Sequence, residues 1–386
     1  MQHKKIGVIG GGTMGAGIAQ VAAQAGHTVV VVDRSGEVLE KAQKQLAVLM
    51  QKKVDKQQMR VDEATQLQAR ITWTSDLMLL SGASLVIEAI VENLGIKQSL
   101  FSELEGIVDA SCILASNTSS LSITSIASAC KNPERVMGIH FFNPAPLMAL
   151  VEMVPALQSD MHLVEQTTAL IQSWGKSTVL AKDIPGFIVN RLARPYYSEA
   201  LRIYEEGIAD ISSIDEAMRR IGGFKMGPFE LMDLIGHDVN YTVTETVWQS
   251  YYYDVRYTPS YVQKRLVEAG WLGRKRGRGF YTYVDGQIQR GAVTANEATL
   301  QAIAERIILM LIHEAAHGLY LGVASKEDID KAMQLGVNYP QGLLQWADAW
   351  GHDVCVQRMD ALYARYREDR YRGAVLLRDT LNQTFF

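Results

Sequence analysis

The sequence predicts an α/β domain followed by two copies of an all-α domain. Short apolar runs alternate with helical patterns up to about residue 183, and a glycine-rich turn follows the first run. After Pro185 the strand patterns almost vanish and long helical patterns take over. Residues 191–239 also match residues 306–354 without a gap. Alternating strands and helices are typical of a parallel sheet covered on both faces.

The first elements form one βαβ unit. We expect residues 5–9 to be a buried strand, 10–12 a tight turn, 14–25 a helix and 29–32 a second strand. Further apolar runs continue the sheet, at residues 85–90, 112–115, 136–139 and 150–154. Residues 1–184 are therefore predicted to be one domain.

The internal repeat divides the remainder of the chain. It pairs the segment 199–200 with 314–315 and the Gly-His-Asp-Val segment 236–239 with 351–354. A repeat of this length indicates a duplicated domain, with copies at 185–285 and 286–386 and a polar linker at about 285–298. Asn190 in the first copy is matched by Glu305, so any function of Asn190 is lost from the second copy.

Composition excludes several classes of function. With 48% hydrophobic and 21% charged residues the chain is globular, and its net charge of −4 gives no basic face for nucleic acid. Three cysteines without metal-like spacing argue against disulfides and a metal site and fit a reducing cytoplasm. No apolar run reaches the ~18 residues of a membrane span, and the start of the chain has no export signal. We expect a cytoplasmic protein without metal or membrane partner.

The turn Gly-Gly-Gly-Thr-Met-Gly at residues 10–15 has the pattern of a dinucleotide-binding loop in a Rossmann-type domain. Gly10 permits the turn, Gly12 lets the backbone approach a pyrophosphate, and Gly15 allows close helix packing. The helix N-terminus at Thr13 and Met14 then offers N–H groups to the phosphates.

An acidic residue completes this pattern. Asp33 follows the second strand, where it can accept ribose hydroxyls and repel a 2′-phosphate, which favours NAD over NADP. Arg34 weakens that preference slightly. The alternative is a tight turn without a ligand.

A second group of polar residues can move a proton. His140 comes just past a predicted strand, and Glu152 lies near the end of the next run, where it could bind one ring nitrogen of His140. A carboxylate partner fixes the tautomer and makes histidine a better base near neutral pH. The alternative is a histidine that is merely satisfied in the core. The polar stretch 116–120 could hold substrate or could cap a helix.

Lys52 and Lys56 lie four residues apart on a predicted helix patterned by Leu39, Ala42, Leu46 and Leu49. Two neighbouring ammonium groups suit a phosphate-rich ligand, and a solvated charged face is the alternative interpretation.

Together these motifs resemble the L-3-hydroxyacyl-CoA dehydrogenase family, and the match runs through both helical copies. The carriers are the segments 10–19, 86–92 (Val-Ile-Glu-Ala-Ile-Val-Glu), 115–121 (Ala-Ser-Asn-Thr-Ser-Ser-Leu), 138–144 (Gly-Ile-His-Phe-Phe-Asn-Pro), 185–191 (Pro-Gly-Phe-Ile-Val-Asn-Arg), 227–231 (Gly-Pro-Phe-Glu-Leu), 271–275 (Trp-Leu-Gly-Arg-Lys) and 279–281 (Gly-Phe-Tyr).

The resemblance implies NAD-dependent oxidation of (S)-3-hydroxyacyl-CoA, with His140 as the catalytic base and Glu152 as its orienting partner. It implies that Ser119 and Asn190 hold the substrate oxygen and thioester. It further implies an NAD site lined by Glu92, Lys97, Asn143 and Lys275, and CoA phosphates gripped by Lys52 and Lys56.

Three hypotheses about function follow. The tandem copies and the segments 194–200 (Arg-Pro-Tyr-Tyr-Ser-Glu-Ala) and 336–340 (Gly-Val-Asn-Tyr-Pro) look closest to 3-hydroxyadipyl-CoA dehydrogenases of phenylacetate catabolism. The linker between the copies is short, whereas longer members of that group carry an extra segment. Fatty-acid-type β-oxidation is the other pathway in which this activity is expected. A short-chain 3-hydroxybutyryl-CoA dehydrogenase shares every motif. A lens-crystallin-like structural protein is the alternative of another class.

Family members with one helical copy usually dimerise through it. A second copy that imitates this interface would allow a monomer, and a homodimer is the alternative.

Overall fold

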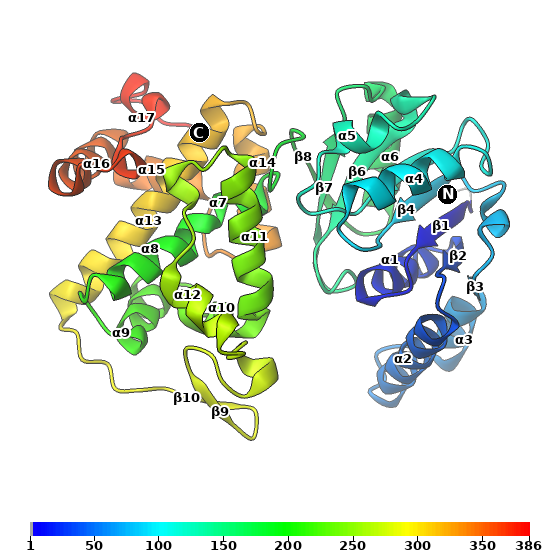
Figure 1. The fold of residues 1–386 in the computed structure, drawn as a ribbon, viewed down its shortest axis with the longest axis horizontal. Helices are drawn as coiled ribbons and strands as arrows, with labels where there is room; N and C mark the ends of the chain where they lie inside the picture. The colour runs from blue at the N-terminus through cyan, green and yellow to red at the C-terminus, as the bar shows by residue number, and fades with distance from the viewer. Residues whose placement is uncertain (1–2) are drawn as a thin grey trace. The chain divides into compact units, whose positions relative to one another are not determined.

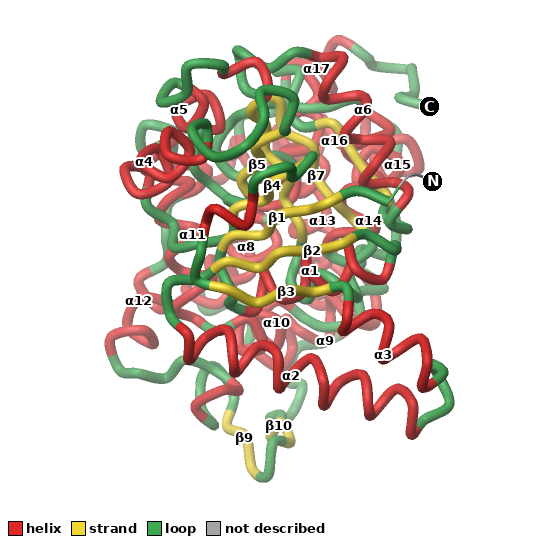
Figure 2. The backbone as a smooth tube through the Cα atoms, turned by 90° about the vertical axis from the view of Figure 1, so that its right-hand side faces the viewer, coloured by secondary structure: helices red, strands yellow, loops and turns green. Residues whose placement is uncertain are grey.

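The computed structural model describes residues 3–386, and the chain divides into two compact units, Met1–Ile184 and Pro185–Phe386. The first unit, which we call the α/β unit, contains an eight-stranded sheet in the order β3-β2-β1-β4-β5-β6-β7-β8 (Figures 1 and 2). The strands are β1 Lys5–Ile9, β2 Thr28–Val32, β3 Ile71–Thr74, β4 Leu85–Glu88, β5 Ile113–Ser116, β6 Val136–Phe141, β7 Leu150–Pro155 and β8 Ser177–Leu180.

Helices cover both faces of this sheet. They are α1 Thr13–Gln24, α2 Gly36–Asp55, α3 Val61–Ala69, α4 Leu94–Leu104, α5 Ile123–Ala127 and α6 Met161–Ser173, with 3-10 turns η1 Leu77–Leu80 and η2 Pro133–Arg135. Ile6 and Val8 of β1 share one core with α1, α2, α3 and α6. On the other face Gly7 lies against Leu80 of η1, and Gly138 lies against Ile123 of α5. Burial on both faces explains why the central strands are almost continuously apolar.

All six predicted strands are present, with ends that differ by one or two residues. The two strands of this sheet that were not predicted, β3 and β8, lie at its edges. Each has only one or two fully buried residues and carries threonine or serine among its apolar residues. Their apolar pattern was therefore too weak to predict a strand.

The sheet is mixed rather than parallel, which corrects the prediction. β7 runs antiparallel to β6, and β8 then runs parallel to β7. The loop between β6 and β7 is too short for the helical crossover that a parallel connection requires. His140 consequently lies within β6, not just past a strand.

α2 also differs in one detail from its predicted pattern. Its buried residues are Leu39, Ala42, Leu46 and Met50, whereas Leu49 is 40% exposed. The helix begins after Ser35, whose hydroxyl accepts the Val38 N–H and caps the first turn.

The second unit, which we call the helical unit, packs α8 against the long helix α13 (Figure 1). Its helices are α7 Val189–Leu192, α8 Arg194–Glu205, α9 Ile211–Glu216, α10 Pro228–Ile235, α11 His237–Ser250, α12 Tyr261–Glu268, α13 Glu297–Tyr320, α14 Lys326–Gly336, α15 Leu343–Trp350, α16 His352–Tyr366 and α17 Val375–Asp379. Short turns accompany them: η3 Ala217–Ile221, a π-helical turn, and the 3-10 turns η4 Val255–Tyr257, η5 Arg274–Arg276 and η6 Asp369–Tyr371.

The predicted linker contains more structure than expected. Strands β9 Thr282–Val284 and β10 Gln287–Gln289 form a small antiparallel hairpin, and α13 already begins at Glu297. Within residues 3–386, no helix is long and apolar enough to cross a membrane, and no cluster of side chains is suited to hold a metal ion.

Candidate active site

The glycine-rich turn between β1 and α1 requires glycine at two positions and leaves space at a third. Gly10 has a φ of +102°, and a Cβ atom there would lie 2.5 Å from the carbonyl oxygen of Ala89. A Cβ at Gly15 would lie 1.8 Å from the carbonyl oxygen of Gly10, whereas one at Gly12 would meet no atom within 4 Å. No side chain caps the first turn of α1. Its N–H groups therefore stay available to a phosphate group.

Asp33, directly after β2, is held by two backbone N–H groups. Its Oδ2 accepts from Gly11 at 2.7 Å, and its Oδ1 accepts from Ser35 at 2.9 Å. Each carboxylate oxygen keeps a second lone pair that can accept a ribose hydroxyl. Asp33 thus places a negative charge beside the glycine-rich turn, while Arg34 next to it is exposed.

A cavity of about 770 Å³ lies in the α/β unit beside these residues. Its lining includes Gly10, Gly12, Asp33, Arg34, Ile90 and Asn93. These residues follow the carboxyl ends of β1, β2 and β4, the edge at which open α/β sheets bind dinucleotides.

His140 and Glu152 face each other across β6 and β7. They are register partners, and Nδ1 of His140 lies 2.6 Å from Oε2 of Glu152. Glu152 is fully buried and His140 is 6% exposed, with the Phe142 ring centre 4.5 Å from the imidazole centre. A carboxylate at Nδ1 selects the tautomer that carries its proton there and stabilises the imidazolium. The pair is suited to accept a proton at Nε2.

A buried lysine joins two carboxylates near the end of β4. Lys97 of α4 is 1% exposed, and its Nζ lies 2.6 Å from Glu88 and 3.4 Å from Glu92. The ammonium group of Lys97 is therefore paired with carboxylates within the α/β unit. Glu88 was not predicted as a site residue, yet it also accepts from the Ile90 N–H and the Ser116 hydroxyl, each at 2.6 Å. An acidic residue inside an apolar strand was the signal that could have revealed it.

Glu92 holds the loop after β5. It accepts from the hydroxyls of Thr118 and Ser120 at 2.5 and 3.0 Å and from the Ser119 N–H at 3.2 Å. Burial alone would raise the pKa of Glu92, but these hydrogen bonds and the charge of Lys97 lower its pKa below the ordinary 4.5. Glu92 is therefore an anion at neutral pH.

The polar stretch 116–120 serves both structure and a potential ligand. Thr118 Oγ1 accepts the backbone N–H groups two and three residues further on and so stabilises the turn, but it does not cap a helix as the alternative interpretation expected. The cap of α5 is Ser122, just beyond the stretch. Asn117 Oδ1 accepts the Phe141 N–H at 2.8 Å and ties this loop to the end of β6. Among the described residues, the Ser119 hydroxyl has no hydrogen-bond partner.

Three other predicted site residues of the α/β unit are exposed. Lys52 lies in the last turn of α2 and Lys56 directly after it, and neither pairs with a carboxylate of residues 3–386. Asn143 follows β6 and precedes Pro144 through a cis peptide bond.

Asn190 and Lys275 belong to the helical unit. Asn190 lies in α7, and its side-chain amide makes no hydrogen bond to any residue that the structure describes. Lys275 Nζ lies 2.6 and 2.7 Å from the two carboxylate oxygens of Asp238.

Comparisons with known proteins find the same two kinds of domain in one family. A model of the NAD-binding domain of 3-hydroxyacyl-CoA dehydrogenase matches residues 5–184. A model of the C-terminal domain of 3-hydroxyacyl-CoA dehydrogenase matches residues 186–283 and 303–385.

Individual relatives extend over most of the chain. The 3-hydroxyadipyl-CoA dehydrogenase of Escherichia coli K12 is 38% identical over an alignment of 460 residues, which covers 97% of this chain and 96% of that protein. The mitochondrial hydroxyacyl-coenzyme A dehydrogenase of Sus scrofa is 43% identical over 286 residues, 72% of this chain and 91% of that protein. The crystal structure of a 3-hydroxybutyryl-CoA dehydrogenase from Escherichia coli K12 superposes with a TM-score of 0.92 at 37% identity, covering 98% of each chain.

Proposed function

This chain belongs to the 3-hydroxyacyl-CoA dehydrogenase family, and from that premise we propose how its own residues carry out the reaction. It is an NAD-dependent oxidoreductase that converts (S)-3-hydroxyacyl-CoA to 3-oxoacyl-CoA. The observation that carries the proposed mechanism is the 2.6 Å contact between the His140 imidazole and the buried Glu152 carboxylate.

His140 acts as the general base in this proposal. Its Nε2 takes the proton from the 3-hydroxyl group, and Glu152 holds the ring and stabilises the positive charge that forms on it. NAD, when bound, supplies the acceptor for the hydride that leaves C3. A positioned base of this kind contributes about 10²- to 10⁴-fold to the rate.

The residues around the glycine-rich turn fit NAD. The uncapped first turn of α1 offers N–H groups to the pyrophosphate, and Gly12 leaves room for it. Asp33 would accept the ribose hydroxyls and disfavour NADP. We further propose that Asn143 and Lys275 contact NAD directly. Glu92 lines the NAD site, and Lys97 contributes by holding Glu92 in place.

Two uncommitted polar groups are proposed to hold the acyl part of the substrate. The Ser119 hydroxyl and the Asn190 amide lack partners among the described residues, so both can bind the substrate oxygen and thioester. Lys52 and Lys56, exposed and without carboxylate partners within residues 3–386, would grip the CoA phosphates.

We propose 3-hydroxyadipyl-CoA as the substrate, as in phenylacetate catabolism. The support is the full-length similarity to a relative named for that substrate. The relative with a crystal structure is named for 3-hydroxybutyryl-CoA, so a short-chain substrate is the second candidate.

The test is to follow NADH absorbance with acetoacetyl-CoA and with 3-oxoadipyl-CoA. We expect turnover of both, with a higher kcat/KM for the adipyl compound. A higher kcat/KM for acetoacetyl-CoA would favour the short-chain candidate. No turnover of either, in a protein that binds NADH, would contradict the catalytic proposal and favour the crystallin-like alternative.

We also propose that the helical unit is a duplicated domain, because its buried carboxylates repeat. Asp215 accepts the N–H groups of Phe229 and Glu230, which lie 14 and 15 residues further on. Asp330, the matching residue, accepts those 14 and 15 residues beyond it in the same way. The family's C-terminal domain also matches residues 186–283 and 303–385, one segment in each copy.

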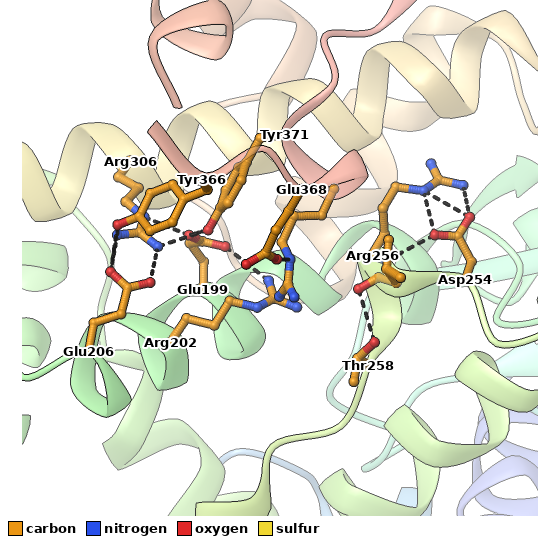
Figure 3. A network of polar contacts seen from close by, with 12 residues as sticks. Glu199, Arg202, Glu206, Asp254, Arg256, Thr258, Arg306, Tyr366, Glu368 and Tyr371 are labelled. Atoms are coloured by element: carbon orange, nitrogen blue, oxygen red, sulfur yellow. Dashed lines mark hydrogen bonds and ion pairs between the residues drawn. The ribbon is translucent and has the colours of Figure 1, made fainter. Parts of the chain in front are cut away.

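The two copies exchange ion pairs. Arg191 of the first copy donates to Glu314 of the second at 2.8 Å, and the matching Arg306 donates to Glu199 at 2.6 Å. Figure 3 shows the second half of this exchange, where Tyr371 joins Arg306 at Glu199. Tyr257 donates to Glu314 correspondingly at 2.6 Å.

Such reciprocity is the pattern of a two-fold dimer interface, in which residue i contacts j and j contacts i. We therefore propose that the second copy replaces a dimer partner and that the protein is a monomer. Sedimentation equilibrium tests this, since a stable dimer formed through the first copy would contradict it.

We place the protein in the cytoplasm. Cys112, Cys130 and Cys355 are unpaired, and burial raises their pKa values to about 12, 11 and 12, so they stay as thiols. Unpaired thiols suit a reducing compartment.

A further inference from the structure

Arg194, the first residue of α8, is a buried cation without a carboxylate. Its side chain is 5% exposed, and its Nε donates to the Asn190 carbonyl at 2.8 Å. Its Nη1 donates to the Thr244 hydroxyl at 3.0 Å, and its guanidinium carbon lies 5.0 Å from the centre of the Tyr197 ring. Among the described residues no carboxylate forms an ion pair with it. Within residues 3–386 its positive charge is thus uncompensated.

A buried arginine and a half-buried arginine of the helical unit are both neutralised. Arg191 pairs with Glu314, and Arg306 pairs with both Glu199 and Glu206. An unpaired buried charge is strongly destabilising, because the desolvation cost is not offset by an opposite charge. Arg194 therefore needs a reason beyond the stability of the fold.

The second helical copy shows that the fold does not need a cation here. The residue that matches Arg194 is Leu309, which is buried in α13. An apolar side chain thus fills the corresponding place in the duplicated scaffold.

A second buried polar group packs against the helix that begins at Arg194. Tyr339, after α14, is 5% exposed, and its hydroxyl has no hydrogen-bond partner among the described residues. Its ring centre lies 5.7 Å from that of Tyr196, which follows Arg194 by two residues in α8. The residue that matches Tyr339 in the first copy is Phe224, which packs against it with ring centres 4.9 Å apart. The hydroxyl of Tyr339 is therefore not required by the packing of the scaffold.

A guanidinium and a phenol hydroxyl are both hydrogen-bond donors, and here both are buried without an anion. The ligand that satisfies them is an acceptor with a negative charge, and carboxylates suit arginine because of its planar fork of N–H groups. Arg194 also lies one helical turn from Asn190, whose amide is the proposed substrate ligand.

We propose that Arg194 and Tyr339 bind the distal carboxylate of a dicarboxylyl-CoA substrate and so select it over a monocarboxylyl chain. This inference rests on the dehydrogenase function proposed above. It names the residues that would distinguish the adipyl from the short-chain candidate.

The test compares 3-hydroxyadipyl-CoA with 3-hydroxyhexanoyl-CoA, two six-carbon chains that differ by the terminal carboxylate. The readout is the ratio of kcat/KM for the first over the second, measured for the wild type and three variants. We expect Arg194→Met to lower this ratio about 10- to 100-fold, the range for a lost hydrogen bond to a charged group, chiefly through KM. Arg265→Met, which removes an exposed arginine of α12, should keep the wild-type ratio.

Tyr339→Phe is the second test. It removes only a hydroxyl without a partner among the described residues and leaves the buried cation in place, so the loss of that cation cannot explain its effect. It should lower the ratio about 3- to 10-fold. An unchanged ratio in either folded variant, or a wild type that does not prefer the adipyl compound, would overturn the inference. Absence of turnover of both compounds by the wild type would instead overturn the proposed function.

Discussion

The two proposed helical copies, residues 185–285 and 286–386, share several structural contacts but differ at the positions where a ligand could bind. Both contain a buried histidine that contacts an aspartate four residues before it, at 2.7 Å for His237 with Asp233 and 3.0 Å for His352 with Asp348. In both, the helix before that histidine ends at a glycine with a positive φ angle. These repeated contacts connect helices within each copy.

At other positions the polar side chain of one copy is not repeated in the other. Asn190 is matched by Glu305 and Arg194 by Leu309, so the first copy alone has the uncommitted amide and the unpaired guanidinium. The second copy has the uncommitted hydroxyl of Tyr339 where the first has Phe224. The comparison teaches that repeated polar groups hold the scaffold together, whereas unrepeated ones indicate function.

The largest effect is expected on kcat, and it should distinguish two similar histidine–carboxylate pairs. His140→Gln removes a pair that occurs only in the α/β unit, and we expect kcat to fall about 10²- to 10⁴-fold because the base is lost. His237→Gln removes a pair repeated in both copies and should lower the unfolding midpoint rather than kcat. Steady-state kinetics and thermal unfolding of both variants measure this. A catalytic loss in His237→Gln with unchanged stability would break the distinction.

Removing either ion pair between the copies should lower the free energy of unfolding, but the two losses should differ in size. Glu314→Gln leaves Arg191 without a carboxylate, and removing one partner of a buried pair costs about 3–5 kcal/mol. Glu199→Gln should cost less, because Arg306 keeps Glu206. Urea unfolding followed by circular dichroism compares the two. Equal losses would show that Glu206 does not compensate.

A smaller effect is expected at the first unrepeated position. Asn190→Ala should lower kcat/KM about 10- to 100-fold through a lost substrate hydrogen bond, with little change in stability because the amide has no partner in the part of the chain that the structure describes. Glu305→Ala, the matched change in the second copy, should leave kcat/KM unchanged. If both variants lost activity equally, the second copy would have kept a role in catalysis.

The smallest effect concerns pH. Burial alone would raise the pKa of Glu314, but Arg191, Arg256 and the hydrogen bond from Tyr257 lower it below 4.5. Since the folded pKa is the lower one, this stabilisation is complete above about pH 4.5 and is lost as the pH falls through the folded value. The stability difference between wild type and Glu314→Gln should therefore shrink by up to about 1.4 kcal/mol per pH unit below pH 4.5. A constant difference from pH 7 to pH 3 would contradict the lowered pKa.

Much of the site could be predicted because its residues act through local sequence. Gly10 and Gly15 are required by a turn whose geometry is set within a few residues, and Asp33 follows the next strand at a characteristic spacing. The partnership of His140 with Glu152 could be proposed from two neighbouring strands. That the strands are antiparallel, which puts the two residues in register, was not predicted.

Other residues could not be found from local patterns. Glu88, inside an apolar strand, is explained by Lys97 of the following helix and Ser116 of the neighbouring strand. Met50 lies on the buried face of α2 where Leu49 was predicted, because the packing of neighbouring elements decides which face of a helix is buried.

The sequence by itself determined the order of the units, the repeat and the family, because glycine turns, apolar periodicity and motif spacing are local properties of the chain. Only the tertiary structure decided which buried charges are compensated. Arg191 and Glu314 lie 123 residues apart and Arg306 and Glu199 lie 107 apart, and each pair meets only when the copies pack. Because electrostatic compensation depends on distance in space, only the fold could show that Arg194 has no counter-charge among the residues that the structure describes.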